Sequence, residues 1–465
     1  MREGVSSATV MVSPGLVPSF SPSQPDYVVR CDSATPVSLA FTPPTGAAVS
    51  VDGAPAQQGP STASVHLAYD AELTFTITDS GGARTYYVRC LPPDFPHYTV
   101  TGRGSSSIQG FLADPSLGSG SSNYLILFDA AGVPIWWTAP AQPTIDATMT
   151  PKRQIAYETY GGNAFETDPT QGYQLYSLDG TSEGTVHAVG GATDTHEFQV
   201  DSNGNYDLLS YRERRHVNLT AIGGTRDAEV VDCVAEIVSP TGRLLWSWDA
   251  YQHLGVRQFA IPDETAADEL ARMPDGTTAA DIYHCNAMQV AGPDVLLSFR
   301  HLDAVYLLDR KTGTVVWKLG GTTTAKSLAI QGDTRSTPLD GQHDARLLSD
   351  GSLTVHDNAT FSGLPPRMAR YRVDTTKRTA TLVQQIVDPN IAASPCCGSA
   401  RTLPDGSVLV DWGGTTTVDE YTPKGKRLLR LTFASGSSYR ATPIPAGVVT
   451  LQQIRTGMNK MTTGS

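Results

Sequence analysis

The feature that most constrains the fold is a run of four short apolar segments at residues 281–321, DIYHCNAMQVAGPDVLLSFRHLDAVYLLDRKTGTVVWKLGG. Alternating polarity, frequent β-branched residues and Gly, Pro or Asp between the segments favour strands over helix. The pattern predicts strands over residues 287–290, 295–299, 304–308 and 314–317. Four consecutive antiparallel strands of this length are typical of one blade of a β-propeller.

The same unit recurs with a fixed register. The glycines of its first hairpin turn are Gly204, Gly292, Gly351 and Gly406. The residues eight positions earlier are His196, His284, His343 and Gly398, in a chain with ten histidines. Those eight positions later are Arg212, Arg300, Ala359 and Gly414. Such recurrence indicates a repeat architecture. Because the first strand of each propeller blade lines the central channel, we expect the three histidines to converge near its axis.

A second recurrence marks the outer hairpins. A tryptophan stands four positions after a turn glycine in the pairs Gly132–Trp136, Gly242–Trp246 and Gly313–Trp317. Propellers that bind quinone cofactors carry such a tryptophan in every blade, but Leu429 takes the fourth position here. The tryptophans are therefore interpreted as packing between blades, and no cofactor is predicted.

The chain divides into two predicted domains, giving an all-β protein with an N-terminal β-sandwich followed by a six-bladed β-propeller. Residues 1–97 contain short alternating strands between Pro, Gly and Asp turns, as in a small sandwich. Residues 98–465 are predicted to form the propeller, with a polar loop over 212–227 and a helix over 262–273. Residues 439–454 are predicted to return as a strand that closes the ring.

Composition narrows the function and the compartment. A formal net charge of −12 argues against nucleic acid, because a phosphate-binding face needs clustered Lys and Arg. No apolar run approaches the length of a membrane-spanning helix. No export signal is visible at the N-terminus as given, so the compartment stays open between an exported protein with a trimmed leader and a cytoplasmic one. The sequence leaves the oligomeric state open as well.

The six cysteines are too few for a disulfide scaffold in a chain of 465 residues. Cys31 and Cys90 lie in two similar strand motifs, YVVRCD and YYVRCL, so a bridge between them is one prediction. Such a bridge would indicate maturation in an oxidising compartment. For Cys233, Cys285, Cys396 and Cys397, burial as small apolar residues is as well supported as any further role.

The motifs HCNA, SFRHLDAVYLLDRKTGTVVWKLGG, GQHDARLLSDGS and CGSARTLPDGSVLVDWGG together resemble the arylsulfate sulfotransferase (arylsulfotransferase) family. The resemblance spans about residues 100–455. It implies that a histidine takes a sulfuryl group from a phenolic sulfate and passes it to another phenol, without a phosphoadenosine donor. By motif, the implied catalytic residues are His343 as nucleophile, His284, Arg300 and His196. Asn286, from the H-x-N motif, is implied to bind substrate.

The chemistry fits these residue types. Attack on a sulfate ester needs a nucleophile that is neutral at pH 7, and imidazole qualifies. The planar donor fork of Arg300 suits the sulfuryl oxygens, and Arg212, at the same register, is predicted to bind substrate as well. Asn286 is expected to face the same side as His284, two residues earlier. A second histidine, His284 or His196, would protonate the leaving phenolate and later deprotonate the acceptor.

Two other classes of function remain open. Three histidines at one register can also bind zinc or iron, as in a metal-dependent hydrolase or lyase, although Arg300 would repel the metal. A non-catalytic ligand-binding propeller is the other alternative, but such a module would more often expose aromatic residues than three histidines and an arginine. A nucleotide-dependent sulfotransferase is disfavoured because no G-x-x-x-x-G-K-[ST] loop is found.

Overall fold

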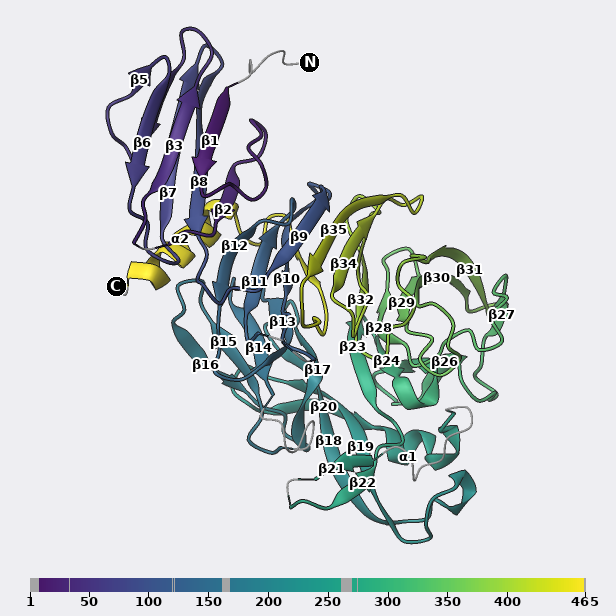
Figure 1. Cartoon of the computed structure of the whole chain (residues 1–465). Coiled ribbons are helices and arrows are strands. Elements are labelled where there is room, and N and C mark those ends of the chain that lie inside the picture. Colours follow the sequence, from purple (N-terminus) through teal and green to yellow (C-terminus); the bar gives the residue numbers. More distant parts are fainter. Residues whose placement is uncertain are drawn as a thin grey trace.

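The computed structural model describes residues 8–32, 34–118, 120, 122–160, 168–260, 270–273 and 275–463. The described chain is all-β, as predicted, and is built from eight sheets (Figure 1). Its helices are few and short: α1 (Ala250–Leu254), α2 (Leu451–Thr463) and the single 3-10 turns η1 (Thr220–Ile222), η2 (Val256–Gln258) and η3 (Arg300–Leu302). Within the described residues, no helix is long and apolar enough to cross a membrane.

Residues 9–90 form two sheets that share one apolar core. The first sheet has the order β1 (Thr9–Ser13), β3 (Val37–Thr42) and β6 (Ser61–Val65). The second has the order β2 (Asp26–Val29), β8 (Gly82–Cys90), β7 (Glu72–Asp79), β4 (Ala48–Val51) and β5 (Gln57–Gln58). Alternate residues of β3 and β7, such as Leu39 and Phe75, are buried between the sheets, as the period of two requires. A disulfide joins Cys31 to Cys90, which confirms that predicted bridge.

Residues 98–445 form six further sheets. The first has the order β36 (Thr442–Pro445), β10 (Ile108–Ala113), β11 (Leu125–Asp129) and β12 (Pro134–Thr138), and the second has the order β13 (Thr144–Met149), β14 (Ile155–Thr159), β15 (Tyr173–Tyr176) and β16 (Ser182–Val186). The third begins with β17 (Ala192–Val200), β18 (Tyr206–Val217) and β19 (Ala228–Val238). In this third sheet, β20 (Leu244–Asp249) and β22 (Thr278–Ala280) both pair with β19, and β21 (Leu270–Arg272) pairs with β22.

The last three contain β23 (Cys285–Ala291), β24 (Asp294–Phe299), β25 (Ala304–Asp309) and β26 (Val315–Gly320); β28 (His343–Leu347), β29 (Ser352–Asp357), β30 (Arg367–Asp374), β31 (Thr379–Ile386) and β27 (Ala329–Gln331); and β32 (Ser399–Thr402), β33 (Val408–Asp411), β34 (Thr417–Tyr421), β35 (Arg427–Phe433) and β9 (Tyr98–Gly102). The four strands predicted within residues 281–321 are therefore confirmed.

The first strands of neighbouring sheets lie against one another, in the order β36, β13, β17, β23, β28 and β32, and β32 contacts β36 again. Two strands distant in sequence complete the end sheets: β36 pairs with β10, and β9 pairs with β35. The predicted return of the C-terminal segment to the first sheet is thus confirmed for residues 442–445. These six strands therefore contact one another in an unbroken series, and we call them the inner strands below.

The turn and hairpin registers are confirmed in detail. The turn glycines Gly204, Gly292, Gly351 and Gly406 all have positive φ values, between 65° and 82°, which glycine adopts without strain. Trp136 donates its indole N–H to the Leu178 carbonyl at 2.8 Å, and Trp246 donates to the Arg310 carbonyl at 2.8 Å. Both acceptors belong to the neighbouring sheet, so these tryptophans hold adjacent sheets together.

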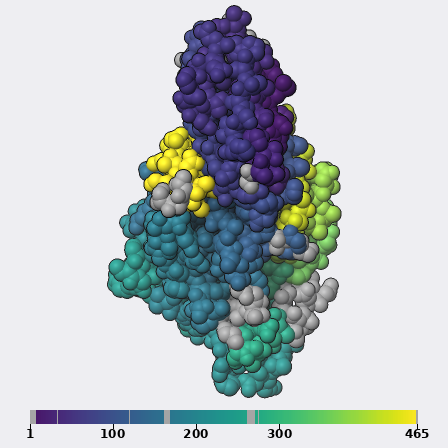
Figure 2. All heavy atoms as spheres, turned by 60° about the vertical axis from the view of Figure 1, so that its left-hand side comes forward, coloured from purple at the N-terminus to yellow at the C-terminus, as the bar shows by residue number. Residues whose placement is uncertain are grey.

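The C-terminal helix joins the N-terminal sheets to the remainder. The guanidinium of Arg455 forms a buried bidentate pair with Asp26, with both N–O distances 2.7 Å, while Ile454 and Met458 pack in the core around β11 and β12. Figure 2 places this yellow segment beside the purple N-terminal region and over the first sheets of the remainder. A charged pair buried on one face and apolar contacts on the other fix α2 between the two parts.

Several local predictions were wrong. Residues 451–454, predicted as part of the closing strand, begin α2. The polar loop predicted over 212–227 is shorter, because β18 continues to Val217, where its long ladder with β19 ends. Of the predicted helix over 262–273, residues 270–272 form β21, and residues 262–269 lie outside the described residues. The cysteines left open are paired, Cys233 with Cys285 and Cys396 with Cys397.

Candidate active site

Irregular starts of the inner strands place the predicted site residues. The pairing of the first two strands shifts register within β13, β17, β23 and β28. His284 has φ 45° and Asp344 has φ 55°, a left-handed conformation that is uncommon for residues with a side chain. Such bulges bend a strand and redirect its side chains. His196 therefore lies within the irregular part of β17, His284 lies just before β23, and His343 is the last paired residue before the irregularity in β28.

His196 and His284 lie together, 5.0 Å apart between ring centroids. Each has its own carboxylate at Nδ1. The Nδ1 of His196 is 2.8 Å from Asp194 Oδ2, and the Nδ1 of His284 is 2.5 Å from Asp281 Oδ2. An imidazole whose Nδ1–H donates to a carboxylate is held in one tautomer and one orientation.

Arg300 and His301 follow β24 directly, in η3. The Nη1 of Arg300 donates to Nε2 of His301 at 2.5 Å, so Nδ1 of His301 carries the proton and donates it to the Asp281 carbonyl at 2.5 Å. The guanidinium of Arg300 also lies 5.0 Å from the ring centre of Phe361. Asp281 therefore supports both His284, through its side chain, and His301, through its backbone. Neither Asp281 nor His301 was among the predicted site residues.

The tautomer of His343 follows from its partners. Nδ1 lies 2.9 Å from Asn358 Oδ1 and 3.0 Å from the Gly341 carbonyl, and both of these atoms can only accept. The amide of Asn358 has this orientation because its Nδ2 donates to the Cys397 carbonyl at 3.0 Å. On the other side of the ring, the backbone N–H of Cys397 donates to Nε2 at 3.2 Å. His343 is therefore neutral, with its proton on Nδ1 and its lone pair on Nε2.

Burial and neighbouring positive charge act on the same histidines. The pKa of His343 is held well below its usual range, first by burial and then by Arg300, His196 and His284. The pKa of His284 is also lowered, because burial outweighs the opposing effect of Asp281. The pKa of His301 is lowered well below its usual range by burial, against the opposing effect of Asp281. The mutual influence of His196, His284, Arg300 and His343 places the four predicted catalytic residues in one cluster, which we call the histidine cluster.

The two predicted substrate-binding residues are placed differently. Asn286 is fully buried, and its Nδ2 donates to the Gln342 carbonyl at 2.7 Å while Oδ1 has no hydrogen-bond partner. It is the extra residue of the bulge in β23, so simple period-two alternation does not apply at this position. Arg212 lies in β18, and its Nε donates to the Gly190 carbonyl at 2.7 Å. The structure gives it no contact with the histidine cluster among the described residues.

Beside the histidine cluster, the inner strands carry a second group of side chains, which we call the charged network. Its buried members are Asp146, Glu197, Asp344, Arg346 and Arg440, with Arg401 at its edge. Arg346 pairs with Glu197 at 2.7 Å and with Asp344 at 2.7 Å. Arg440 pairs with Asp146 at 2.9 Å and donates to the Asn286 carbonyl at 3.1 Å. Five inner strands or their flanks are tied together by these contacts.

The metal alternative can be tested on the ligand set. Among the described residues, the one group with ligand spacing is Asp281, His284 and His301, not the three histidines at the shared register. The guanidinium of Arg300 lies 2.5 Å from His301. A cation bound there would face this fixed positive charge and would displace the hydrogen bond from His284 to Asp281. The donor set therefore fits a metal poorly.

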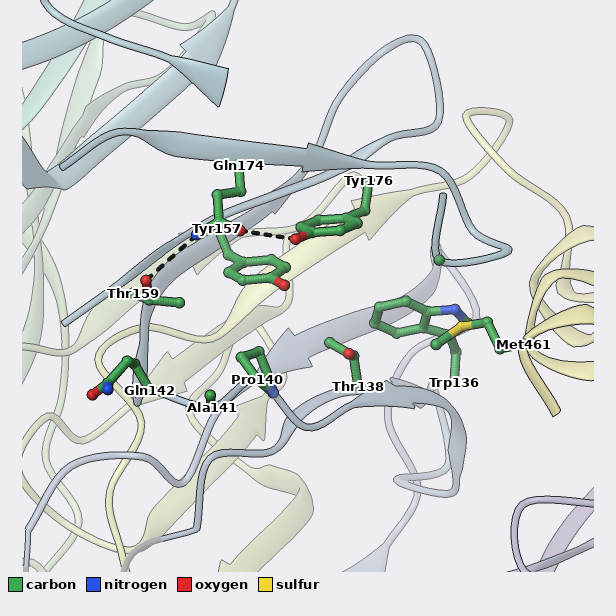
Figure 3. Close-up of a pocket in the computed structure, with 11 residues that line it drawn as sticks. Trp136, Thr138, Pro140, Ala141, Gln142, Tyr157, Thr159, Gln174, Tyr176 and Met461 are labelled. Carbon is green, nitrogen blue, oxygen red and sulfur yellow. Dashed lines mark hydrogen bonds between the residues drawn. The ribbon is translucent and has the colours of Figure 1, made fainter. Parts of the chain in front are cut away.

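A surface groove of about 420 Å³ lies elsewhere, between β12 and the strands β14 and β15 (Figure 3). Tyr157 and Tyr176 stack there with ring centroids 5.3 Å apart, and Trp136, Gln142 and Met461 complete the walls. All of its lining side chains are uncharged, whereas a sulfate ester needs cationic or strong hydrogen-bond donors. None of the predicted site residues lines this groove, so we interpret it as a space between adjacent sheets.

The fold and the cluster define an all-β protein whose inner strands bring histidines and an arginine together at one centre. The model of the arylsulfotransferase (ASST) family matches residues 170–434, more than half of the chain, and the chain belongs to this family. The match includes His196, Arg212, His284, Asn286, Arg300 and His343.

The remaining comparisons are distant. The comparison with curated proteins finds no match. Among solved structures, the chain is similar to a protein of unknown function from Bacteroides caccae, at 12% identity and TM-score 0.41 over 73% of this chain and 99% of that one. It is also similar to a streptogramin B lyase (11%, TM-score 0.35, 79% and 91%) and to a virginiamycin B lyase from Staphylococcus aureus (6%, TM-score 0.36, 72% and 99%). Likenesses this weak say nothing of the chain's chemistry.

Proposed function

We propose that the protein is an aryl-sulfate sulfotransferase that moves a sulfuryl group from a phenolic sulfate ester to a phenolic acceptor through a sulfohistidine intermediate, independently of phosphoadenosine donors. The observation that carries the proposal is the state of His343. Its partners leave a lone pair on Nε2, and its lowered pKa keeps the ring neutral at neutral pH. A neutral imidazole beside a guanidinium is what attack on an anionic ester requires.

The first half-reaction would run as follows. The Nε2 lone pair of His343 attacks sulfur, the bond from sulfur to the phenolic oxygen breaks, and that oxygen leaves with the electron pair. Arg300 would hold the sulfuryl oxygens, because its guanidinium interacts electrostatically with His343 and presents several donors. Asn286 and Arg212 are proposed to bind substrate as well; the Nδ2 of Asn286 donates to the Gln342 carbonyl, so its unpartnered Oδ1 would accept from the hydroxyl of the acceptor phenol.

The second half-reaction reverses these roles. An acceptor phenol attacks the sulfuryl group on His343, and its proton must go to a base. His284 suits this step, because its lowered pKa keeps it neutral and Asp281 takes its Nδ1–H, which directs Nε2 away from that carboxylate. His196 has the same arrangement with Asp194. We propose that one of these two histidines takes the proton of the entering phenol at Nε2 and, once protonated, gives that proton to the phenolate that leaves in the next cycle, which contributes about 10²- to 10⁴-fold to such reactions.

The architecture behind this site is proposed to be a small β-sandwich over residues 1–97 and a six-bladed β-propeller over residues 98–465. Six sheets with contiguous inner strands support the propeller, as do the pairing of β36 with β10 and of β9 with β35. Two sheets around one core support the sandwich. The three disulfides support maturation in an oxidising compartment.

The test is an assay with purified protein, 4-nitrophenyl sulfate, excess phenol, a chelator and no nucleotide. The proposal expects nitrophenolate release that depends on phenol and yields phenyl sulfate in equal amount. Release that is seen in a parallel assay without chelator but not in its presence would favour the metal-dependent alternative. Absence of release with several aryl sulfates would favour a ligand-binding protein.

A further inference from the structure

An unusual loop lies against the candidate nucleophile. Residues 394–398 form the last part of the connection from β31 to β32 and contain the disulfide between the adjacent residues Cys396 and Cys397. Gly398 ends this loop and stands at the position of the repeat that holds histidine in three other sheets. Where the sixth sheet lacks a histidine, a disulfide loop therefore approaches His343 instead.

The loop is tightly clamped. A Cβ atom at Gly413 would lie 2.3 Å from the Cys396 carbonyl oxygen and 2.2 Å from the Cys397 carbonyl carbon, distances that no side chain can adopt. Cys397 is buried against Ile145 and Tyr439, and it has φ 66°. A position with this strained conformation persists only when its surroundings fix it, and such positions concentrate at functional sites.

The loop reaches both nitrogens of the His343 ring. The N–H of Cys397 donates to Nε2, and the Cys397 carbonyl accepts from Nδ2 of Asn358, whose Oδ1 accepts the Nδ1–H. Asn358 is itself fully buried and also donates to Ser394 Oγ at 2.8 Å, within the same loop. One short peptide segment thus controls the orientation and the tautomer of the ring.

We propose that the disulfide-closed loop at Cys396–Cys397, together with Asn358, is a working part of the sulfuryl-transfer site. Asn358 is the positioning residue: it holds the Nδ1–H, and its hydrogen bond strengthens when bonding of Nε2 to sulfur makes the ring positive. The N–H of Cys397 loses its acceptor when the lone pair is used, and it then donates to a sulfuryl oxygen. This inference rests on the proposed function of His343.

Asn358 can be tested by two substitutions of similar size. Asn358→Asp places a carboxylate at Nδ1, which favours the protonated ring, so the acid limb of the donor half-reaction should move to higher pH. Arg300, His196 and His284 face the ring in both proteins, so the shift reports the new carboxylate. Asn358→Leu should lower the rate about tenfold to a hundredfold without moving the aryl sulfate KM to the same extent. Unchanged pH profiles and rates in both variants would overturn the positioning role.

The disulfide is tested with the double variant Cys396→Ser/Cys397→Ser, with Cys31→Ser/Cys90→Ser as a matched control in the N-terminal sheets. Wild type and variants receive 4-nitrophenyl sulfate alone, and the rate of sulfuryl adduct formation is followed by intact mass. We expect a rate about tenfold to a hundredfold lower for the Cys396/Cys397 variant, with thermal unfolding still cooperative, and an unchanged rate for the control.

The outcomes separate this inference from the proposed function. No adduct in wild type would overturn the function itself. Adduct in wild type with an equal rate in the Cys396/Cys397 variant would overturn the role of the loop alone. Alkylation of Cys396 and Cys397 in native, unreduced protein would overturn it as well, because the disulfide would then be absent.

Discussion

The histidine cluster and the charged network lie side by side on the same inner strands, yet they differ in the charge and pairing of their buried side chains. In the charged network, Arg346 and Arg440 are buried and each pairs with acidic side chains at 2.7 to 3.6 Å. In the histidine cluster, burial lowers the pKa of His284 and of His343 and so keeps both rings neutral, and the side chain of His284 keeps 18% of its surface exposed. Paired charges hold the inner strands together, whereas a neutral imidazole keeps a lone pair with which it can react. The most charged region is therefore structural.

The largest effect on stability is expected from a substitution in the charged network. Arg346→Met removes the 2.7 Å ion pairs to Glu197 and Asp344 and leaves Glu197 with only the 3.6 Å contact from Arg440, so the free energy of unfolding should fall by about 3–5 kcal/mol. Denaturant unfolding measures it. An unchanged midpoint would mean that the network is not what holds the inner strands.

The counterpart in the histidine cluster is Arg300→Lys. It retains the charge but loses the planar fork, so kcat should fall by about 10²- to 10³-fold while stability is unaffected. Steady-state rates and the unfolding midpoint are compared on the same preparation. A loss of stability equal to that of Arg346→Met would remove the distinction between the two regions.

The pH dependence of the donor half-reaction tests the charge state of the histidine cluster. Attack requires neutral His343, and because its pKa is lowered, protonation occurs only well below the ordinary histidine pKa of about 6.5. The donor half-reaction should therefore keep its rate as the pH falls from 7 through 6.5. A rate already halved at pH 6.5 would contradict the lowered pKa.

The smallest effect is expected far from both regions. Trp246→Phe removes the hydrogen bond to the Arg310 carbonyl between adjacent sheets, which should cost about 1 kcal/mol of stability. Rates should stay within about twofold of wild type, as for a position remote from the chemistry. A larger kinetic effect would connect the outer hairpins to the site.

The sequence predicts the strands and the histidine cluster because both repeat. A glycine turn fixes each hairpin, and a histidine eight residues earlier must reach the same height in each sheet, so His196, His284 and His343 can be found by counting. His301 and Asp281 have no counterparts in the other sheets, so no repeat marks them, although His301 stands directly beside Arg300. Asn358 follows the second strand of a single sheet and has no counterpart to mark it.

Other features depend on contacts that no pattern reveals. Period-two alternation fails at Asn286 because a bulge adds one residue to β23. The sequence indicates burial as small apolar residues for the adjacent cysteines Cys396 and Cys397, and their pairing depends on a loop geometry that no pattern reveals. The strand predicted to close the ring ends at Pro445, and the polar and apolar residues from Leu451 onward form a helix that packs on both parts.

The most direct test of the account is the intact mass of wild type and His343→Ala after incubation with 4-nitrophenyl sulfate alone, in the presence of chelator. The account predicts one added sulfuryl group on wild type, located on His343 by peptide mapping and removed when phenol is added, and none on the variant. An adduct of equal amount on His343→Ala, or turnover of wild type with no adduct at any time, would contradict the role of His343.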